Sequence, residues 1–252
     1  DWTEAARKSD RPTPTLCAVL ELYALAGRTE DFLRTARSLL DLGPEAGKRV
    51  LQAVELLPAA LKAPLLEELV ATCPALHAHA IYIAGQLAGA GRVDRAFEVF
   101  AMGMRLPDGP EKLGDGATLQ LLNLDPARAG RIMIDAAREG TWEAGSWNAL
   151  ANQLAGCEGG RDVALLALRT AIQLGAVNDD TLSTALEIDP ATAEALALRS
   201  IESDPKNGAS WWVLGEARNR RGDTDGAFQA LVQYARLSPG RQALEVLLEL
   251  DA

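Results

Sequence analysis

The apolar residues of this sequence fall in segments of roughly 10–15 residues that are separated by glycine and proline. This is the usual length of a helix in a globular protein. Runs of alternating β-branched residues, which would indicate strands, are missing. Counting between the glycine and proline positions predicts about 14 or 15 helices. The pattern therefore predicts an all-α fold.

Three glycines are expected to end helices, because glycine adopts the left-handed backbone conformation that side chains resist. They are Gly27, Gly91 and Gly222. Asp94 and Asp225 would then lie in the first turn of the next helix, where negative charge is favourable. Five prolines are expected at helix starts, where proline is tolerated: Pro44, Pro58, Pro126, Pro190 and Pro205.

The chain repeats itself with an offset of 64 residues. Asp125-Pro126-Ala127 recurs as Asp189-Pro190-Ala191, and four further positions match at the same offset: Ala129 and Ala193, Ser146 and Ser210, Trp147 and Trp211, and Leu150 and Leu214. An aspartate directly before a proline is a natural helix N-cap. Self-similarity of this length is typical of arrays of helical hairpins.

Composition supports this prediction. Hydrophobic residues make up 48% of the 252 residues but aromatics only 5%, and the excess comes from alanine and leucine, which lose little on entering a helix. We expect a single superhelical domain over residues 1–252. Residues 107–116 are rich in proline and glycine and are either a hinge or, as loop lengths favour, a wider loop between repeats.

The net charge is −10, from 35 acidic and 25 basic residues. This argues against binding nucleic acid, which requires a surplus of lysine and arginine on one face. It is compatible with a basic protein partner, although acidic charge also simply keeps a protein soluble. No apolar stretch approaches the length of about 20 residues that a membrane span needs.

Three scattered cysteines, Cys17, Cys73 and Cys157, fit buried free thiols in a reducing compartment better than disulfides or a zinc site. We therefore expect a cytoplasmic protein, with the periplasm as the alternative. The chain begins at Asp1 without a methionine and stops directly after a helical stretch. It is expected to be part of a longer protein or to be trimmed at its N-terminus.

No catalytic, cofactor-binding or metal-binding residues are predicted. His77 and His79 are two positions apart and would point to different sides of a helix. The glycine-rich strings lack the strand and the Lys-Ser/Thr of a phosphate loop. The adjacent acids Glu67-Glu68 and Asp179-Asp180 are interpreted as solvated helix faces. The chain is therefore not expected to be an enzyme by itself.

The last repeat resembles the tetratricopeptide family. Its residues stand at the spacing of that family's pattern of Trp-x2-Leu-Gly, Tyr, Ala, a large apolar residue and Pro: Trp211, Leu214, Gly215, Gly222, Ala227, Leu231 and Pro239. Arg218 replaces the expected tyrosine and Leu231 the phenylalanine. Units near Leu16, Ile83 and Trp147 match less closely, and the repeats are degenerate and of bacterial type. Segments 45–73, 110–140 and 178–204 are expected to be helical hairpins or half-units without the motif.

This resemblance implies a right-handed α-solenoid of antiparallel helical hairpins, with small residues where paired helices cross closely. Gly215, Ala227, Ala84 and Ala96 are such residues. In such a stack the first helix of each hairpin lines the concave groove. Family members use groove asparagines to hold an extended peptide and basic residues to bind its acidic groups.

The candidate groove residues follow from that register: Asn148, Asn152, Trp212, Glu216, Asn219, Arg220 and Tyr82. Each has a structural alternative. The two asparagines also fit an ordinary polar helix face. Trp212 fits a helix interface and Tyr82 a core position. The basic residues, Arg220 and Arg218, are too few to favour a peptide C-terminal carboxylate as the ligand.

Three functional hypotheses follow. The first is a scaffold that binds a partner protein or extended peptide in its groove. The second is a substrate-recruiting domain of a larger bacterial enzyme, such as a protein glycosyltransferase. The third is self-association through an apolar last helix that contains Ala243, Leu244, Val246, Leu247 and Leu250.

Overall fold

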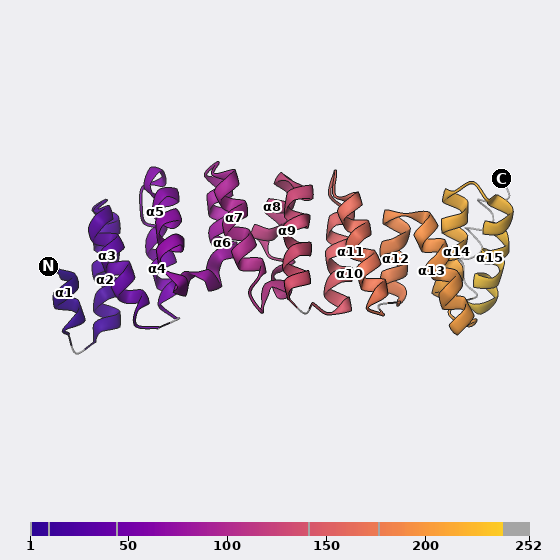
Figure 1. Cartoon of the computed structure of the whole chain (residues 1–252), viewed down its shortest axis with the longest axis horizontal. Coiled ribbons are helices and arrows are strands. Elements are labelled where there is room, and N and C mark those ends of the chain that lie inside the picture. Colours follow the sequence, from indigo (N-terminus) through magenta and orange to yellow (C-terminus); the bar gives the residue numbers. More distant parts are fainter. Residues whose placement is uncertain (1, 10, 44, 141, 176, 239–252) are drawn as a thin grey trace. The chain divides into compact units, whose positions relative to one another are not determined.

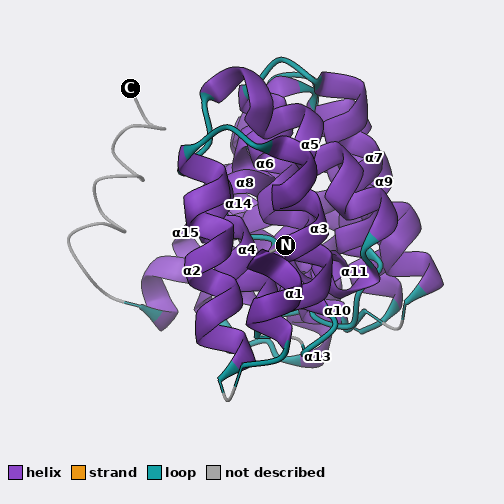
Figure 2. Cartoon of the chain, turned by 90° about the vertical axis from the view of Figure 1, so that its left-hand side faces the viewer, coloured by secondary structure: helices purple, strands orange, loops and turns teal. Residues whose placement is uncertain are grey.

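The computed structural model describes residues 2–9, 11–43, 45–140, 142–175 and 177–238 (Figure 1). Within these ranges the chain forms fifteen α-helices, two short 3-10 helices and no strand (Figure 2). The prediction of an all-α fold with 14 or 15 helices is confirmed. Pro44, Pro239 and the apolar run from Ala243 to Leu250 lie outside the described residues.

The contacts of the chain group into two compact units, Asp1–Leu124 and Asp125–Ala252. Residues 107–116 lie inside the first unit and contain the 3-10 helix Gly109–Lys112. The expectation of one superhelical domain over the whole chain stays a prediction, as does its right-handed course.

The first unit consists of eight α-helices: α1 Trp2–Arg7, α2 Pro12–Leu25, α3 Thr29–Leu40, α4 Ala46–Val54, α5 Ala59–Thr72, α6 Ala80–Gly89, α7 Val93–Met104 and α8 Gly116–Leu124. A 3-10 helix, Pro74–His79, precedes α6. Helices α2 and α3, and likewise α6 and α7, pack together as neighbours in sequence. Phe32 on α3 and Phe97 and Phe100 on α7 are buried completely or almost so.

The described residues of the second unit contain seven α-helices: α9 Pro126–Glu139, α10 Ala144–Ala155, α11 Arg161–Gln173, α12 Asp179–Ile188, α13 Pro190–Ser203, α14 Gly208–Arg220 and α15 Thr224–Leu237. The closest pairs are α10 with α11 and α14 with α15. Helix α12 contacts both α10 and α14. The first helices of three successive hairpins are thus neighbours, as a helical repeat requires.

The helix ends follow the local signals. Gly27, Gly91 and Gly222 have φ angles of 65°, 75° and 82°, in the left-handed region. Asp94 lies in the first turn of α7 and Asp225 in the first turn of α15. These predictions are confirmed. They could be made from the sequence because each depends only on residues within one turn of the helix end. The segments 45–73, 110–140 and 178–204 likewise contain the helices α4 and α5, α8 and α9, and α12 and α13.

The proline prediction is wrong at Pro205. Pro126 and Pro190 are the first residues of α9 and α13, and Pro58 directly precedes α5. Helix α14, however, begins after its N-cap Asn207. The carbonyl of Pro205 instead accepts a hydrogen bond from the indole Nε1 of Trp211 at 2.9 Å. Asn207 replaces it as helix start because its side chain can accept the Ser210 N–H, which proline cannot do.

Small residues lie where paired helices approach closely, as the family resemblance implies. A Cβ atom added to Gly215 on α14 would lie 2.5 Å from Cγ of Leu231 on α15. Ala227 on α15 and the pair Ala84 and Ala96 on α6 and α7 are fully buried. The described chain is therefore an all-α helical repeat of closely packed helices.

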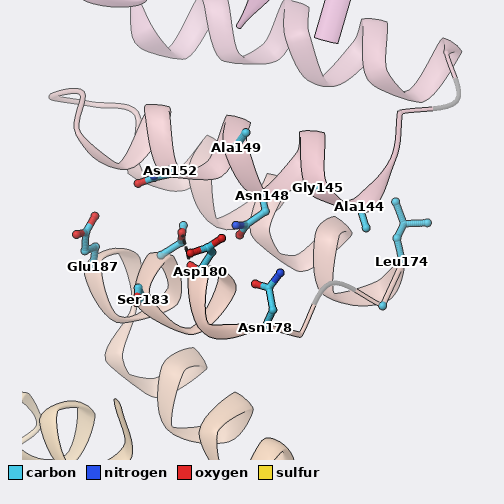
Figure 3. Close-up of a pocket in the computed structure, with 12 residues that line it drawn as sticks. Ala144, Gly145, Asn148, Ala149, Asn152, Leu174, Asn178, Asp180, Ser183 and Glu187 are labelled. Carbon is cyan, nitrogen blue, oxygen red and sulfur yellow. Dashed lines mark hydrogen bonds between the residues drawn. The ribbon is translucent and has the colours of Figure 1, made fainter. Parts of the chain in front are cut away.

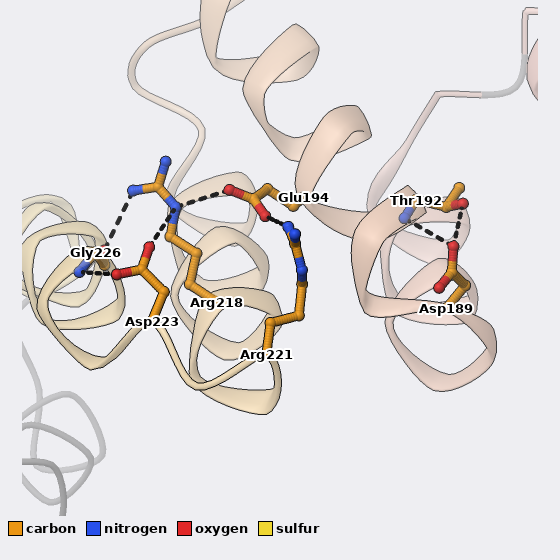
Figure 4. Close-up of polar contacts among 7 residues, drawn as sticks. All are labelled: Asp189, Thr192, Glu194, Arg218, Arg221, Asp223 and Gly226. Atoms are coloured by element: carbon orange, nitrogen blue, oxygen red, sulfur yellow. Dashed lines mark hydrogen bonds and ion pairs between the residues drawn. The ribbon is translucent and has the colours of Figure 1, made fainter.

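Asp125 and Asp189 are N-caps, as their repeated Asp-Pro sequence predicts. The carboxylate of Asp125 accepts the Arg128 N–H at 2.9 Å. That of Asp189 accepts the Thr192 N–H at 3.0 Å and the Thr192 hydroxyl at 2.6 Å (Figure 4). The hydrogen bonds from Thr192 hold the pKa of Asp189 below its ordinary value of 3.8.

We expect Asp189→Ala to lower the free energy of unfolding by about 1 kcal/mol at pH 7, the usual effect of removing an N-cap. A carboxylate with a lowered pKa stabilises the fold above its ordinary pKa, and this contribution is lost as the pH falls through the lowered value. Urea unfolding at pH 7 and at pH 3 would measure both effects.

Asp189→Asn is the matched control, because the amide oxygen can still cap the helix but does not titrate. Below about pH 4 the free energy of unfolding should fall more for wild type than for this variant, because only the wild-type carboxylate becomes protonated. An unchanged difference between pH 7 and pH 3 would contradict the assigned role of the carboxylate.

Candidate functional site

A hollow of about 710 Å³ lies between α10 and α12 in the second unit (Figure 3). Its polar lining residues come from both helices and from the turn that leads into α12: Asn148, Asn152, Asn178, Asp180, Ser183, Thr184 and Glu187. Ala144, Gly145 and Ala149 lie along the α10 side and leave the space open. The lining includes two carboxylates and no lysine or arginine.

Helix α10 brings two asparagines to this hollow. Trp147, Leu150 and Ala151 on the other faces of the helix are buried in the core. Asn148 and Asn152 therefore face outward, one helical turn apart. Asn148 is half-buried and Asn152 is exposed. The Oδ1 atom of Asn148 is buried and accepts no hydrogen bond from the described part of the chain.

Helix α12 forms the opposite wall with a polar stripe. Asp180, Ser183 and Glu187 are exposed and stand at the i, i+3, i+7 spacing of one helix face. Leu182, Ala185 and Leu186 are buried on the other side of the helix, which orients the stripe toward solvent. Among the described residues, neither acid forms an ion pair.

Two other polar groups of the hollow are already occupied by the fold. The side-chain oxygen of Asn178 caps α12 by accepting the Thr181 N–H at 2.9 Å and the Thr181 hydroxyl at 2.8 Å. The Thr184 hydroxyl donates to the backbone carbonyl of Asp180 at 2.8 Å. The groups that remain available to a ligand are those of Asn148, Asn152, Asp180, Ser183 and Glu187.

The four candidates on α14 do not line this hollow. Arg220 donates from Nη1 to the carbonyl of Leu186 at 2.8 Å, at the C-terminal end of α12, and its Nε lies 3.9 Å from Glu216. Trp212 is half-buried and Asn219 is exposed. Arg220 thus interacts with Glu216 and with α12. The binding role of these four residues stays a prediction.

Arg218 is part of a separate network that joins α13, α14 and α15 (Figure 4). Its Nε lies 3.0 Å from Glu194 and 3.8 Å from Asp223, and its Nη1 donates to the Gly226 carbonyl at 3.3 Å. Arg221 also pairs with Glu194. The Arg218 guanidinium therefore links α14 to α13 and α15, and its bonding capacity is used within the fold.

Tyr82 lies on α6 in the first unit, where it lines a different hollow of about 680 Å³ together with Lys62, Gln86 and Gln120. Its hydroxyl donates to Glu55 at 2.9 Å. Partial burial and the neighbouring Glu55 carboxylate raise the pKa of Tyr82 above its ordinary value of 10.0. The seven candidates are therefore divided among two hollows and α14. Only Asn148 and Asn152 come together in one hollow as expected.

Sequence reasoning missed the α12 side of the hollow. Asp179-Asp180 was interpreted only as a solvated pair, and residues 178–204 carry no tetratricopeptide motif that would set their register. The helical spacing of Asp180, Ser183 and Glu187 opposite the apolar Leu182, Ala185 and Leu186 was the available signal. Asp179 differs from its neighbour, since it accepts a hydrogen bond from Asn207 Nδ2 at 3.3 Å.

Within the described ranges, no group of three or more His, Cys, Asp and Glu side chains is placed to hold a metal ion. Among the described helices, none is both long and apolar enough to cross a membrane.

Comparison with known proteins gives only distant structural likenesses. No protein-family model and no curated protein sequence matches the chain. The structure of yeast Tom70 is similar with a TM-score of 0.39 and 14% identity, over 96% of this chain and 60% of that one. The TPR domain of P58(IPK) is similar with a TM-score of 0.33 and 15% identity, over 95% of this chain and 78% of that one. Both TM-scores lie below 0.5, so neither likeness bears on the function or partner of this chain.

Proposed function

We propose that this chain is a protein-interaction scaffold and that the hollow between α10 and α12 holds an extended segment of a partner protein. The observation that carries the proposal is that Asn148 lines the hollow while its buried Oδ1 accepts no hydrogen bond from the described part of the chain. A buried acceptor without a donor costs about 1–3 kcal/mol, and a ligand that supplies the donor recovers it.

The spacing of the two asparagines supports an extended ligand. Asn148 and Asn152 are four residues apart, which is about 6 Å along a helix. Backbone groups on one side of an extended chain recur every two residues, or about 6.6 Å. An amide side chain carries both a donor and an acceptor, so each asparagine can pair with one peptide group of such a segment.

The size of the hollow also supports a ligand of several residues. Its volume of about 710 Å³ lies within the range of about 300–1,000 Å³ that ligand sites usually have. The small side chains of Ala144, Gly145 and Ala149 leave the α10 wall low enough for a chain to lie across it.

Filling the hollow tests this proposal. Ala149→Trp places a large side chain at an exposed position of the α10 wall. We expect at least a tenfold loss of affinity, or about 1.4 kcal/mol, for the partner that the wild-type chain captures from a lysate of its source cells. Quantitative pull-down at several bait concentrations would measure it.

Ala195→Trp is the matched control, since Ala195 is an exposed position on α13 outside the hollow. Circular dichroism would establish that both variants keep their helices. If both variants retain the partner equally, the binding surface lies elsewhere, and the proposed use of this hollow is wrong.

A further inference from the structure

We infer that the segment held between α10 and α12 is basic and presents two lysine or arginine side chains, one to Asp180 and Asn148 and the other to Glu187. This inference rests on the proposed function and names the chemistry of its partner. The free polar atoms of the hollow are mostly acceptors, and a cationic side chain consists of donors.

The first subsite lies near the N-terminal end of α12. Asn148 and Asp180 point toward one another across the hollow (Figure 3). The buried Oδ1 of Asn148 lacks a donor, and the Asp180 carboxylate forms no ion pair within the described ranges. A lysine ammonium has three N–H donors and a positive charge, so it can pair with the exposed Asp180 carboxylate and donate a further hydrogen bond toward the Asn148 side chain.

The second subsite is at Glu187, two helical turns further along α12. Seven residues correspond to about 10.5 Å along the helix axis. In a segment with the polyproline II conformation, which has three residues per turn and a rise of about 3.1 Å per residue, side chains three positions apart lie on the same side and are about 9 Å apart. A segment with the pattern Lys-x-x-Lys therefore matches the spacing of the two carboxylates.

Two arginines bond to the backbone on either side of Glu187 and not to its carboxylate. Arg161 donates from Nε to the Ile188 carbonyl at 2.7 Å, and Arg220 donates to the Leu186 carbonyl at 2.8 Å. Both guanidinium groups bond to the carbonyls at the C-terminal end of α12, where positive charge is favourable. The Glu187 carboxylate is left to interact with an incoming cation.

Three labelled peptides of equal length test this inference by fluorescence anisotropy at low ionic strength. Their common glycine-serine background carries Lys-Ser-Gly-Lys, Gln-Ser-Gly-Gln or Glu-Ser-Gly-Glu at the centre. We expect the lysine peptide to bind about tenfold more tightly than the glutamine peptide, which corresponds to about 1.4 kcal/mol for the two solvent-exposed ion pairs together. The glutamate peptide should bind most weakly.

The double variant Asp180→Asn, Glu187→Gln should remove this preference. The control double variant Asp135→Asn, Glu202→Gln makes the same change of net charge at exposed positions outside the hollow, and it should retain the preference. Equal binding of the lysine and glutamine peptides would overturn the inference. So would a lysine preference that survives in the first variant, or one that falls equally in both, which would reflect only the overall charge of −10.

The two proposals can fail separately. If the glutamine peptide binds as tightly as the lysine peptide and both are lost with Ala149→Trp, the hollow is a binding site but the cationic ligand is wrong. If the lysine peptide binds Ala149→Trp unchanged, the hollow itself is not the site. Absence of binding by the lysine peptide at millimolar concentration overturns the inference about charge. The pull-down with Ala149→Trp then decides separately whether the hollow binds a partner.

Discussion

Replacing Trp147 with alanine is expected to lower the free energy of unfolding of the second unit by about 3–5 kcal/mol, the usual cost of removing a large aromatic side chain from a core. The Trp147 side chain is only 3% exposed. Its ring centroid lies 6.3 Å from that of Trp142 with the planes tilted by 58°, a favourable aromatic arrangement. Urea unfolding followed by circular dichroism would measure the loss.

The matched comparison is Trp211→Ala, at the equivalent position of the next repeat copy. Trp211 is half-buried, and its Nε1 donates to the Pro205 carbonyl at 2.9 Å. Its removal should cost about 1–2 kcal/mol, from part of its apolar area and one hydrogen bond. Equal losses for the two variants would show that the packing difference between the copies has no energetic consequence.

The second large effect is expected at Gly215, where alanine should lower the free energy of unfolding by up to about 2 kcal/mol. The added Cβ would lie 2.5 Å from Cγ and 2.8 Å from Cδ2 of Leu231. Leu231 is 1% exposed and cannot move away without displacing other core atoms. Overpacking of this kind costs about 1–3 kcal/mol, and the higher helix propensity of alanine offsets about 1 kcal/mol of it. Thermal and urea unfolding would measure the result.

Gly145→Ala is the control with the opposite expected sign. Gly145 is an exposed helical position on α10, and a Cβ there would meet no atom within 4 Å. The substitution should raise the free energy of unfolding by about 0.5–1 kcal/mol, because alanine loses less conformational entropy in a helix. Stabilisation by alanine at Gly215 as well would contradict the close approach of α14 and α15.

The helix boundaries could be predicted because their causes are local. Gly222 has a φ of 82° and lies just after the C-terminal end of α14. Asp189 caps α13 by accepting the N–H of Thr192, three residues away. Pro205 is the instructive error. Proline is compatible with a helix start, but α14 begins two residues later, where the side-chain oxygen of Asn207 accepts the Ser210 N–H and caps the helix.

Trp147 and Trp211 show that a residue's position in a repeat does not predict how deeply its side chain is buried. Trp147 and Trp211 occupy equivalent positions, yet one is buried against Trp142 and the other bonds to the turn before its helix. A residue's place in a repeat predicts its helix and its approximate face. Its burial depends on the neighbours that the adjacent helices supply.

The candidate site was predicted only in part for the same reason. The i, i+4 spacing of Asn148 and Asn152 was sufficient to place them on one face of α10. Glu216 and Arg220 satisfy the same spacing rule, but Arg220 is bonded to the Leu186 carbonyl on another helix. Asp180 is not predicted as a site residue from the sequence, because adjacent acids such as Asp179 and Asp180 usually form a solvated helix face.

By itself, the sequence determined the all-α class, the number and ends of the helices, and the hairpin packing around Gly215, because helix propensity, capping and small-residue spacing act over a few residues. Only the tertiary structure decided which polar side chains remain free for a ligand. Arg218 bonds to Glu194 across 24 positions and Arg220 to Leu186 across 34. The Asn148 oxygen and the Asp180 carboxylate face one hollow because α10 and α12 pack side by side. Hydrogen bonds and ion pairs between helices depend on distances that folding sets, and no pattern within a single helix contains them.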